Sequence, residues 1–476
     1  MHLIRTTICH NAPQRRGSDT FAVNVKLGLD ISQSNPPGPS RWQMMRSMGR
    51  VIEDPLSTLR RLHARHGDVV HLRLPFRDAL LINHPDLVEE VLLRNASQFR
   101  KDILLREVKI LLGDGLLTSE DSFWRRQRKL ASPFLVRRQI EKYAKDMIRM
   151  ATSFSESLVD GEEIDIHRRA TALTLDIVSL TLFGTDGDDR VAEQVERCLD
   201  VTMDYFFRVT RSWRRVLPRW LPTAQNRRTA AAIEELDSIV YRIIADRRRS
   251  GANGDDLLSR LISAMDEDGR QMNDQQVRDE VITMFLAGHE TTAIAFANTL
   301  WLLSQNPDAA APLYDEIDSL GEPLNPRDVD ALPYTNAVLT EALRLQPPAW
   351  SVAREATTDT TIGEYAVPRG MQVYLSQYLI QRDPRFYPDP LRFDPSRWLD
   401  DHPEPLPRFA YFPFGGGPRV CIGNHFALME LKLMLVCTLR RARLVHREGH
   451  EVRYLPSVTL RPITPMPMRV HIPSRP

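Results

Sequence analysis

A long region of helical periodicity constrains the fold of this chain more than any other feature. From about residue 116 to about residue 350, apolar residues recur at intervals of three and four positions, and strand signals are few. Short β-rich runs with several prolines follow at 350–380 and 452–472, while 54–74 predicts a helix that ends at Gly67 and then a short strand. We therefore predict a mainly α fold with small β-sheets (α+β), built as a single large domain.

The prolines of NPPGPSRW, residues 35–42, mark the start of this domain, because clustered prolines exclude a helix there. We predict a flexible N-terminal extension over 1–34 and one domain over 35–476. The extension has neither a membrane-spanning run nor a secretory signal, although its arginines loosely resemble a transit peptide. The chain carries 63 basic and 62 acidic residues, which argues against nucleic acid as a partner. Its four cysteines form no C-x-x-C pair, so we expect reduced thiols and a cytoplasmic monomer.

The segment FPFGGGPRVCIGNHF, residues 412–426, places a cysteine between three glycines and an apolar helical pattern. The thiolate is the form that binds metal, and it needs backbone N–H donors or the positive end of a helix. The glycines let the backbone fold closely around the sulfur of Cys421. Arg419, which we predict in an extended segment, would point to the same side as the sulfur and could hold an anionic group of its ligand.

Two alternatives remain open at this point. A lone cysteine is commonly a small buried hydrophobe. A zinc site is the other alternative, because His425, Cys437 and His446 follow Cys421, although their spacing matches no closed Cys/His set.

The pattern F-x-x-G-x-R-x-C-x-G is filled by Phe414, Gly417, Arg419, Cys421 and Gly423, and it resembles the haem-binding loop of the cytochrome P450 superfamily. The resemblance implies that Cys421 is the axial ligand of the iron of haem b and that Phe414 belongs to the haem-binding residues. The matched segments run in the family's order over nearly the whole chain. The mostly helical, triangular P450 fold is therefore implied.

Two further segments, EALR and FDPSRW, match the parts of the family that form a buried Glu-Arg-Arg network near the haem loop. In this chain the network would consist of Glu341, Arg344 and Arg397, held by the two bonds that a planar guanidinium can make to a carboxylate. Without the resemblance, Glu341 and Arg344 would be an ordinary surface pair on a helix. The chain departs from the pattern at Gln381, where many members carry histidine.

The segment MFLAGHETTAIAFANTLWLL, residues 284–303, lies in a long apolar helical run. Ala287 and Gly288 are small where a flat cofactor must come close, and Glu290 and Thr291 place an acid and a hydroxyl beside that gap. The motif A-G-x-E-T-T resembles the oxygen-binding groove of the family, which implies that Thr291 faces dioxygen and that both residues organise proton delivery. The alternative is a core helix with a threonine bonded to its own backbone.

The segment FWRRQRKL places Trp124 and Arg128 four positions apart, and therefore on one face of a helix. The two residues match the family's W-x-x-x-R, whose indole N–H and guanidinium hold a haem carboxylate. Arg354 and Arg419 occupy the other positions that the resemblance implies for binding the two carboxylates. A cation–π pair or a basic surface helix is the alternative for Trp124 and Arg128.

The implied activity is monooxygenation, in which one atom of O2 enters an apolar substrate by hydroxylation or epoxidation. By their place in the pattern, Ala287, Trp350, Val352 and Leu460 would line the substrate pocket. A terpenoid, fatty acid, steroid or polyketide would fit, as in secondary metabolism. The alternatives are a peroxide-driven hydroxylase or a lipid isomerase of the same fold, or a non-catalytic haem-thiolate sensor. The retained acid and threonine argue against all three.

Electrons are expected from separate proteins, because no flavin or nicotinamide segment follows the haem domain. The expected partners are a ferredoxin or flavodoxin with its reductase, so that NAD(P)H would act only indirectly. Basic side chains near the cysteine loop are the candidate docking residues, although such charges usually form a solvated face: Arg125, Arg126, Lys129, Arg137 and Arg138.

The segment 206–228 holds seven arginines and no acid, together with four large aromatic residues. By its position it would cover the substrate entrance and could touch a membrane surface or an acidic carrier protein. A solvated basic surface is the alternative.

Overall fold

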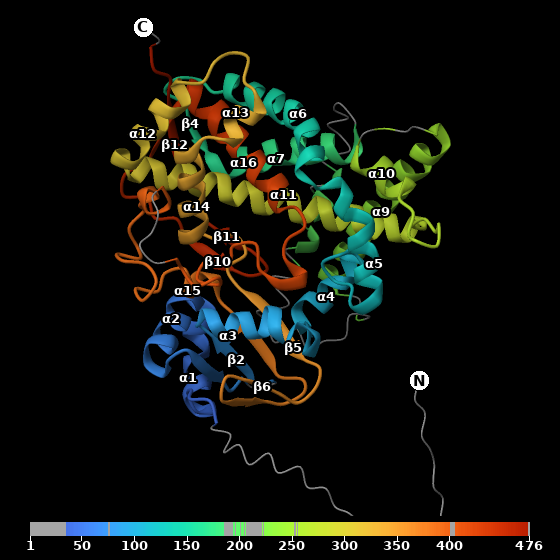
Figure 1. The fold of residues 1–476 in the computed structure, drawn as a ribbon, viewed down its shortest axis with the longest axis vertical. Helices are drawn as coiled ribbons and strands as arrows, with labels where there is room; N and C mark the ends of the chain where they lie inside the picture. Colours follow the sequence, from blue (N-terminus) through green and yellow to red (C-terminus); the bar gives the residue numbers. More distant parts are fainter. Residues whose placement is uncertain are drawn as a thin grey trace, which may run out of the picture.

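The computed structural model describes residues 35–74, 77–184, 194–195, 197–199, 201–203, 205, 221, 223–251, 254, 256–399 and 405–474. In Figure 1 most of the helices gather in the upper part of the molecule, and a β-sheet with α1, α2 and α3 forms the lower part. The helices are α1 (Arg41–Glu53), α2 (Pro55–His66), α3 (Pro85–Glu89), α4 (Ile103–Leu112), α5 (Asp121–Ala131), α6 (Arg137–Glu156), α7 (Ile166–Phe183), α9 (Ala224–Ser250), α10 (Leu257–Ser263), α11 (Asp274–Gln305), α12 (Pro307–Asp318), α13 (Pro326–Asp330), α14 (Pro333–Leu345), α15 (Gln377–Ile380) and α16 (Asn424–Arg441).

The strands are short and form four small sheets. They are β1 (Val69–Leu72), β2 (Ala79–Ile82), β3 (Phe99–Lys101), β4 (Glu163–Asp165), β5 (Val352–Ala356), β6 (Thr360–Ile362), β7 (Tyr365–Val367), β8 (Gln372–Leu375), β9 (Arg443–His446), β10 (Tyr454–Pro456), β11 (Leu460–Pro462) and β12 (Pro467–His471). The largest sheet has the order β1-β2-β8-β5-β3. Its β3 and β5 are antiparallel, and their register places Lys101 opposite Arg354.

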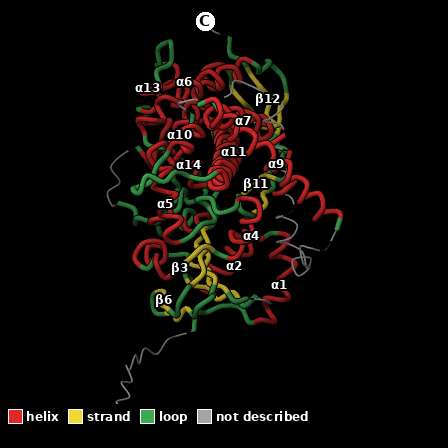
Figure 2. The backbone as a smooth tube through the Cα atoms, turned by 90° about the vertical axis from the view of Figure 1, so that its right-hand side faces the viewer, coloured by secondary structure: helices red, strands yellow, loops and turns green. Residues whose placement is uncertain are grey.

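Helix α11 crosses the middle of the helical part (Figures 1 and 2). It begins with a capping box, in which the Asn273 side chain accepts from the Gln276 N–H and the Gln276 side chain accepts from the Asn273 N–H. Its residues are buried on nearly all sides, which is the pattern of a core helix rather than of a surface helix. It ends at Asn306, where Pro307 begins α12.

Two apolar clusters divide α11 between them. Residues 277–285 pack in a cluster with α4, α9 and α10, and residues 293–303 pack in another with α6, α14 and α16. The segment 286–292, which contains the A-G-x-E-T-T motif, lies between the clusters. There Ala287 is exposed, although it is in the middle of a helix whose residues are mostly buried.

The predicted mainly α fold with small sheets is confirmed by this architecture. Helix α2 ends before Gly67, which has a φ of 87°, and β1 follows as predicted. The β-rich runs form β5 to β8 and β10 to β12. The proposed extension 1–34 and most of the basic segment, 206–220 and 222, lie outside the described residues, so both stay predictions. Within the described part of the chain, no helix combines the length and apolar character needed to span a membrane.

Candidate functional site

The loop before α16 holds Cys421 in a tight turn. The Cys421 N–H donates to the Phe414 carbonyl at 3.0 Å, which closes the turn around the glycines. Gly417 has a φ of 66°, and a Cβ atom there would lie 1.7 Å from the Leu92 carbonyl oxygen. Only glycine fits this position, because both its conformation and its contact exclude a side chain.

The sulfur of Cys421 borders open space inside the protein. Its side chain is exposed, yet burial raises the pKa of the thiol, opposed by the Gly423 N–H and by Arg128. A sulfur in such a place is ready for a ligand but needs a positive partner to ionise fully. The predicted extended conformation of Arg419 is wrong, because Gly417–Arg419 forms a 3-10 turn that is the tightest way to join the glycines to the cysteine.

Helix α5 brings Trp124 and Arg128 to this loop. The Arg128 guanidinium donates to the Val420 carbonyl at 2.9 Å and lies 5.7 Å from the centre of the Trp124 ring. The guanidinium of Arg419 lies 3.9 Å from the same ring and pairs with Glu120. The Trp124 side chain is largely buried, and among the described residues its indole N–H has no hydrogen-bond acceptor.

Two more cations, Lys101 and Arg354, face each other across β3 and β5. Both are buried, and neither forms an ion pair with any residue that the structure describes. Burial, together with the charges of Arg354 and Arg419, lowers the pKa of Lys101 to about 7. Burial and the charge of Arg419 lower the pKa of Arg354 to about 10.

The cluster is therefore rich in positive charge. Its cations are Lys101, Arg128, Arg354 and Arg419, whereas its nearby acids are Glu120 and the helix cap Asp102. Such a group, with an unsatisfied indole N–H beside it, suits a ligand that carries two carboxylates. Sequence reasoning missed Lys101, because only the β3–β5 register, which a single sequence does not reveal, places it beside Arg354.

The A-G-x-E-T-T motif of α11 combines a side-chain hydrogen bond to the backbone with an exposed residue. The Thr291 hydroxyl donates to the Ala287 carbonyl at 2.7 Å, and both residues lie at the exposed edge of the helix. This is the backbone bond that helical threonines often make, and it leaves a lone pair on the oxygen to accept from another group. A Cβ at Gly288 would lie 3.4 Å from Val178 of α7, so this glycine lies against the neighbouring helix.

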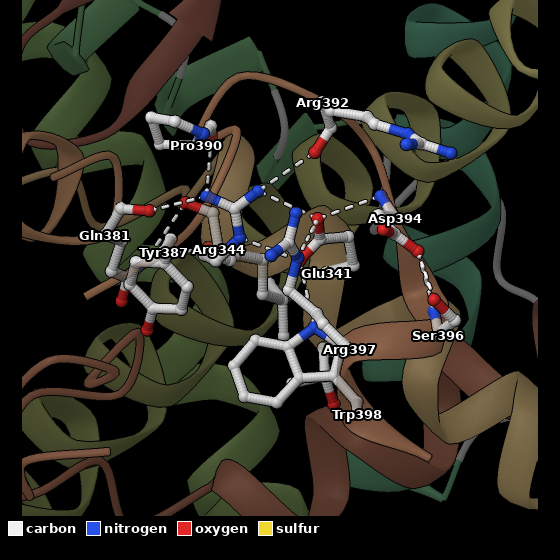
Figure 3. A network of polar contacts seen from close by, with 12 residues as sticks. Glu341, Arg344, Gln381, Tyr387, Pro390, Arg392, Asp394, Ser396, Arg397 and Trp398 are labelled. Carbon is white, nitrogen blue, oxygen red and sulfur yellow. Dashed lines mark hydrogen bonds and ion pairs between the residues drawn. The ribbon is translucent and has the colours of Figure 1, made fainter. Parts of the chain in front are cut away.

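A buried network joins α14 to residues 390–398 (Figure 3). The Arg344 guanidinium forms two bonds to the Glu341 carboxylate, at 2.7 and 2.8 Å. Arg397 donates to the same carboxylate at 3.1 Å, and the Trp398 indole donates to it at 2.9 Å. Glu341 and Arg344 are fully buried, so the interpretation of these residues as a surface pair is wrong.

The buried Gln381 connects this network to the cysteine loop. Its side-chain amide donates to the Leu343 and Arg344 carbonyls at the end of α14, each at 3.0 Å. Its side-chain oxygen accepts from the Phe412 N–H at 3.0 Å. The residue at which the chain departs from the family pattern thus bridges two elements with both ends of its amide.

The candidate pocket residues do not all border the same space. The Trp350 indole donates to the Ser457 carbonyl at 2.8 Å, which places it against the turn of β10–β11. Val352 is half-buried and packs near Gly415 of the cysteine loop. Leu460 is fully buried, and its N–H donates to the Pro348 carbonyl. Phe414 packs against the apolar cluster of α16.

The structure therefore brings together the predicted residues of α5, β5 and the cysteine loop, and it builds the Glu341 network separately below them. The residues of the zinc alternative are not gathered. Cys437 is buried beside Thr152, and His446 lies against the Trp301 ring.

The comparisons with known proteins agree on one family. The model of the family described as Cytochrome P450 matches residues 36–466. Cyclooctatin synthase from Streptomyces melanosporofaciens is 37% identical to the chain over 86% of its length and 90% of the relative's length. Pentalenene oxygenase from Streptomyces avermitilis is 34% identical over 87% of the chain and 90% of the relative.

Two further matches extend this result. Cyclooctat-9-en-7-ol 5-monooxygenase, also from Streptomyces melanosporofaciens, is 36% identical over 82% of the chain and 85% of the relative. The crystal structure of the cytochrome P450DA heme domain superposes with a TM-score of 0.83 at 27% identity, covering 93% of the chain and 98% of that structure.

Proposed function

Because the chain belongs to the cytochrome P450 family of haem monooxygenases, we propose that it inserts one oxygen atom from O2 into an apolar terpenoid. The observation that carries the substrate class is the similarity to the enzymes whose names refer to cyclooctatin and pentalenene, at 34–37% identity over most of the chain. Ala287 is apolar and exposed at the edge of α11, as we expect of a residue that contacts an apolar substrate.

The residues present fit a haem. The cation cluster, which includes Arg354 without any ion pair among the described residues, would be balanced by two haem carboxylates. The unsatisfied Trp124 indole N–H would donate to one of them. The exposed sulfur of Cys421 would bind the haem iron, and the Gly423 N–H would help to hold it as a thiolate. Haem, when bound, supplies the iron chemistry that activates dioxygen with two electrons and two protons.

The roles of the chain's own residues follow from their positions. The Thr291 hydroxyl would accept and pass on a proton at the edge of α11, and the Glu290 carboxylate next to it would replace that proton. Glu341, Arg344 and Arg397 would fix α14 against residues 390–398, because Glu341 and Arg344 are fully buried and their charges are paired within the network.

Electron donors are proposed to be a ferredoxin or flavodoxin with a reductase that oxidises NAD(P)H. The candidate docking residues differ in their availability to such a partner. Arg126, Lys129 and Arg137 already pair with Asp266, Glu267 and Asp330. Arg125 and Arg138 are exposed and form no ion pair within the described residues, so they are the stronger candidates for contact with an acidic partner.

The first test concerns the ligand. The reduced, carbon monoxide-bound protein should show the long-wavelength Soret band of thiolate-ligated haem, and Cys421→His should lose it. Cys437→Ala is the matched control, because this thiol is buried beside Thr152 and away from the loop, and it should keep the band. A normal band in Cys421→His would contradict the proposed ligand.

The second test concerns the substrate. A library of cyclic terpenoids, fatty acids, steroids and polyketides should give substrate-induced shifts of the haem spectrum mainly with the terpenoids. Turnover with a ferredoxin and its reductase should add one oxygen atom to the best of them. Shifts confined to another class would contradict the terpenoid assignment, and turnover only with peroxide would identify a peroxide-driven hydroxylase.

A further inference from the structure

The carboxylate of Glu290 is held by residues from a distant part of the chain. The Thr459 hydroxyl donates to Glu290 Oε1 at 3.1 Å, and the Arg461 Nε lies 4.0 Å from the same oxygen. Thr459 lies in the turn of the β10–β11 hairpin, and Arg461 lies in β11. Glu290 directly precedes Thr291 on α11, so the hairpin holds the acid one position before the hydroxyl in the chain.

The hairpin is itself firmly placed. Arg461 pairs with Leu455 in the antiparallel register, and in the turn the Ser457 N–H donates to the Thr459 carbonyl at 3.0 Å. The Trp350 indole donates to the Ser457 carbonyl at 2.8 Å. A hydroxyl and a guanidinium on so constrained a turn can hold a carboxylate in one orientation.

Arg461 is the more exposed member of its pair with Glu290. The Arg461 side chain is 34% exposed, whereas the Glu290 side chain is 13% exposed. His289 is buried and His167 is half-buried, and both ring nitrogens of His289 and the Nε2 of His167 lack partners among the described residues. Burial and the charge of Arg461 lower the pKa of each to about 4. Neither histidine therefore carries an extra proton to give near neutral pH.

We propose that Thr459 and Arg461 are positioning residues for Glu290, and that protons reach this acid from solvent past Arg461. The hydroxyl orients the carboxylate toward Thr291, and the guanidinium favours its charged form between proton transfers. The charged carboxylate takes up a proton from solvent, gives it to the Thr291 hydroxyl as that group passes its own proton on, and so returns to its charged form. This inference rests on the proposed monooxygenase function, in which Glu290 and Thr291 deliver protons.

The test uses the haem-loaded protein and four substitutions. Arg461→Gln removes the charge, Arg461→Lys retains it, and Thr459→Val removes the hydroxyl. Arg453→Gln is the matched control, because Arg453 precedes the same hairpin, is exposed and forms no ion pair in the described structure. The pKa of the Glu290 carboxyl is measured by pH-dependent infrared difference spectra against Glu290→Gln, and product and peroxide are measured during turnover.

We expect Arg461→Gln to raise the pKa of the Glu290 carboxyl by about one unit, because a cation about 4 Å away is lost. Arg461→Lys should restore most of the wild-type value, and Arg453→Gln should not change it. Arg461→Gln and Thr459→Val should both increase peroxide relative to product, by about threefold to tenfold.

An unchanged Glu290 pKa and unchanged coupling in Arg461→Gln would overturn the inference, as would equal effects of Arg453→Gln. Failure of the proposed function gives a different result. The wild-type protein would then lack the thiolate-haem spectrum or form no product, while the infrared titration would still report on the pair Arg461 and Glu290.

Discussion

Replacing Gln381 by methionine should destabilise the fold strongly, although the two side chains have similar volumes. The Gln381 side chain satisfies the Leu343 and Arg344 carbonyls and the Phe412 N–H, each at 3.0 Å, and it is fully buried. Leaving a buried polar group without a partner costs ~1–3 kcal/mol. One orphaned N–H and two carbonyls that share a donor give an expected loss of about 3–5 kcal/mol in the free energy of unfolding.

Gln377, the first residue of the short helix α15 that ends just before Gln381, provides the matched control. It is also fully buried, but neither its side-chain nitrogen nor its oxygen has a hydrogen-bond partner among the described residues. Gln377→Met removes two unpaired polar atoms and should be neutral or stabilising by up to ~1 kcal/mol. The pair separates the loss of an amide from the loss of its hydrogen bonds.

The haem-loaded variants are unfolded in guanidinium chloride, and unfolding is monitored by far-ultraviolet circular dichroism. Free energies of unfolding are compared among variants whose dependence on denaturant concentration has the same slope. Gln381→His tests the bridge directly, because an imidazole can donate through one nitrogen and accept through the other, and it should lose less stability than Gln381→Met. The reasoning fails if Gln381→Met lies within about 1 kcal/mol of the wild type, or if Gln377→Met costs as much.

Three further predictions concern single side chains. Thr291→Ala should keep haem and substrate binding but lower product per electron by about tenfold to a hundredfold; product, peroxide and reduced cofactor measured together would show this, and full coupling would leave the threonine a purely structural residue. Burial raises the pKa of Glu430 to about 8, so the folded state binds a proton that the unfolded state releases, and stability should fall as pH rises from about 4.5 to about 8; Glu430→Gln should flatten that part of the thermal-unfolding profile, and an unchanged profile would contradict it. Arg354→Met should relieve the repulsion that lowers the pKa of Lys101 and yet speed the loss of haem to a haem-scavenging protein, whereas haem retention at the wild-type rate would argue against carboxylate binding by this cluster.

Local patterns predicted much of this molecule. The periodicity of 116–350 predicted helices, and the glycines before Cys421 predicted a close turn, because steric and capping rules act over a few residues. The geometry of Arg419 was predicted wrongly for a local reason, since alternation along an extended segment does not apply to a 3-10 turn.

What the sequence did not reveal depends on contacts between distant segments. Lys101 joins the cation cluster only through its register with Arg354. Thr459 donates to Glu290 of α11 from a hairpin that begins more than a hundred residues later in the chain. Gln381 looked like a simple departure from a motif, and only the positions of α14 and Phe412 show that both ends of its amide are used.

The division of α11 between two apolar clusters has a consequence for building hybrid enzymes. Among the described elements, only α7 and α11 contribute buried side chains to both clusters. A chimera that exchanges the segment from α7 to 286–292 of α11, together with the segment that contains α4 and α5, would therefore replace the cluster of α4, α9 and α10 as a unit. The cluster of α6, α14 and α16, against which Phe414 of the cysteine loop packs, would keep its own packing. Recombination between relatives at these positions should yield folded proteins more often than recombination within either cluster, because fewer interlocking side chains would be mismatched.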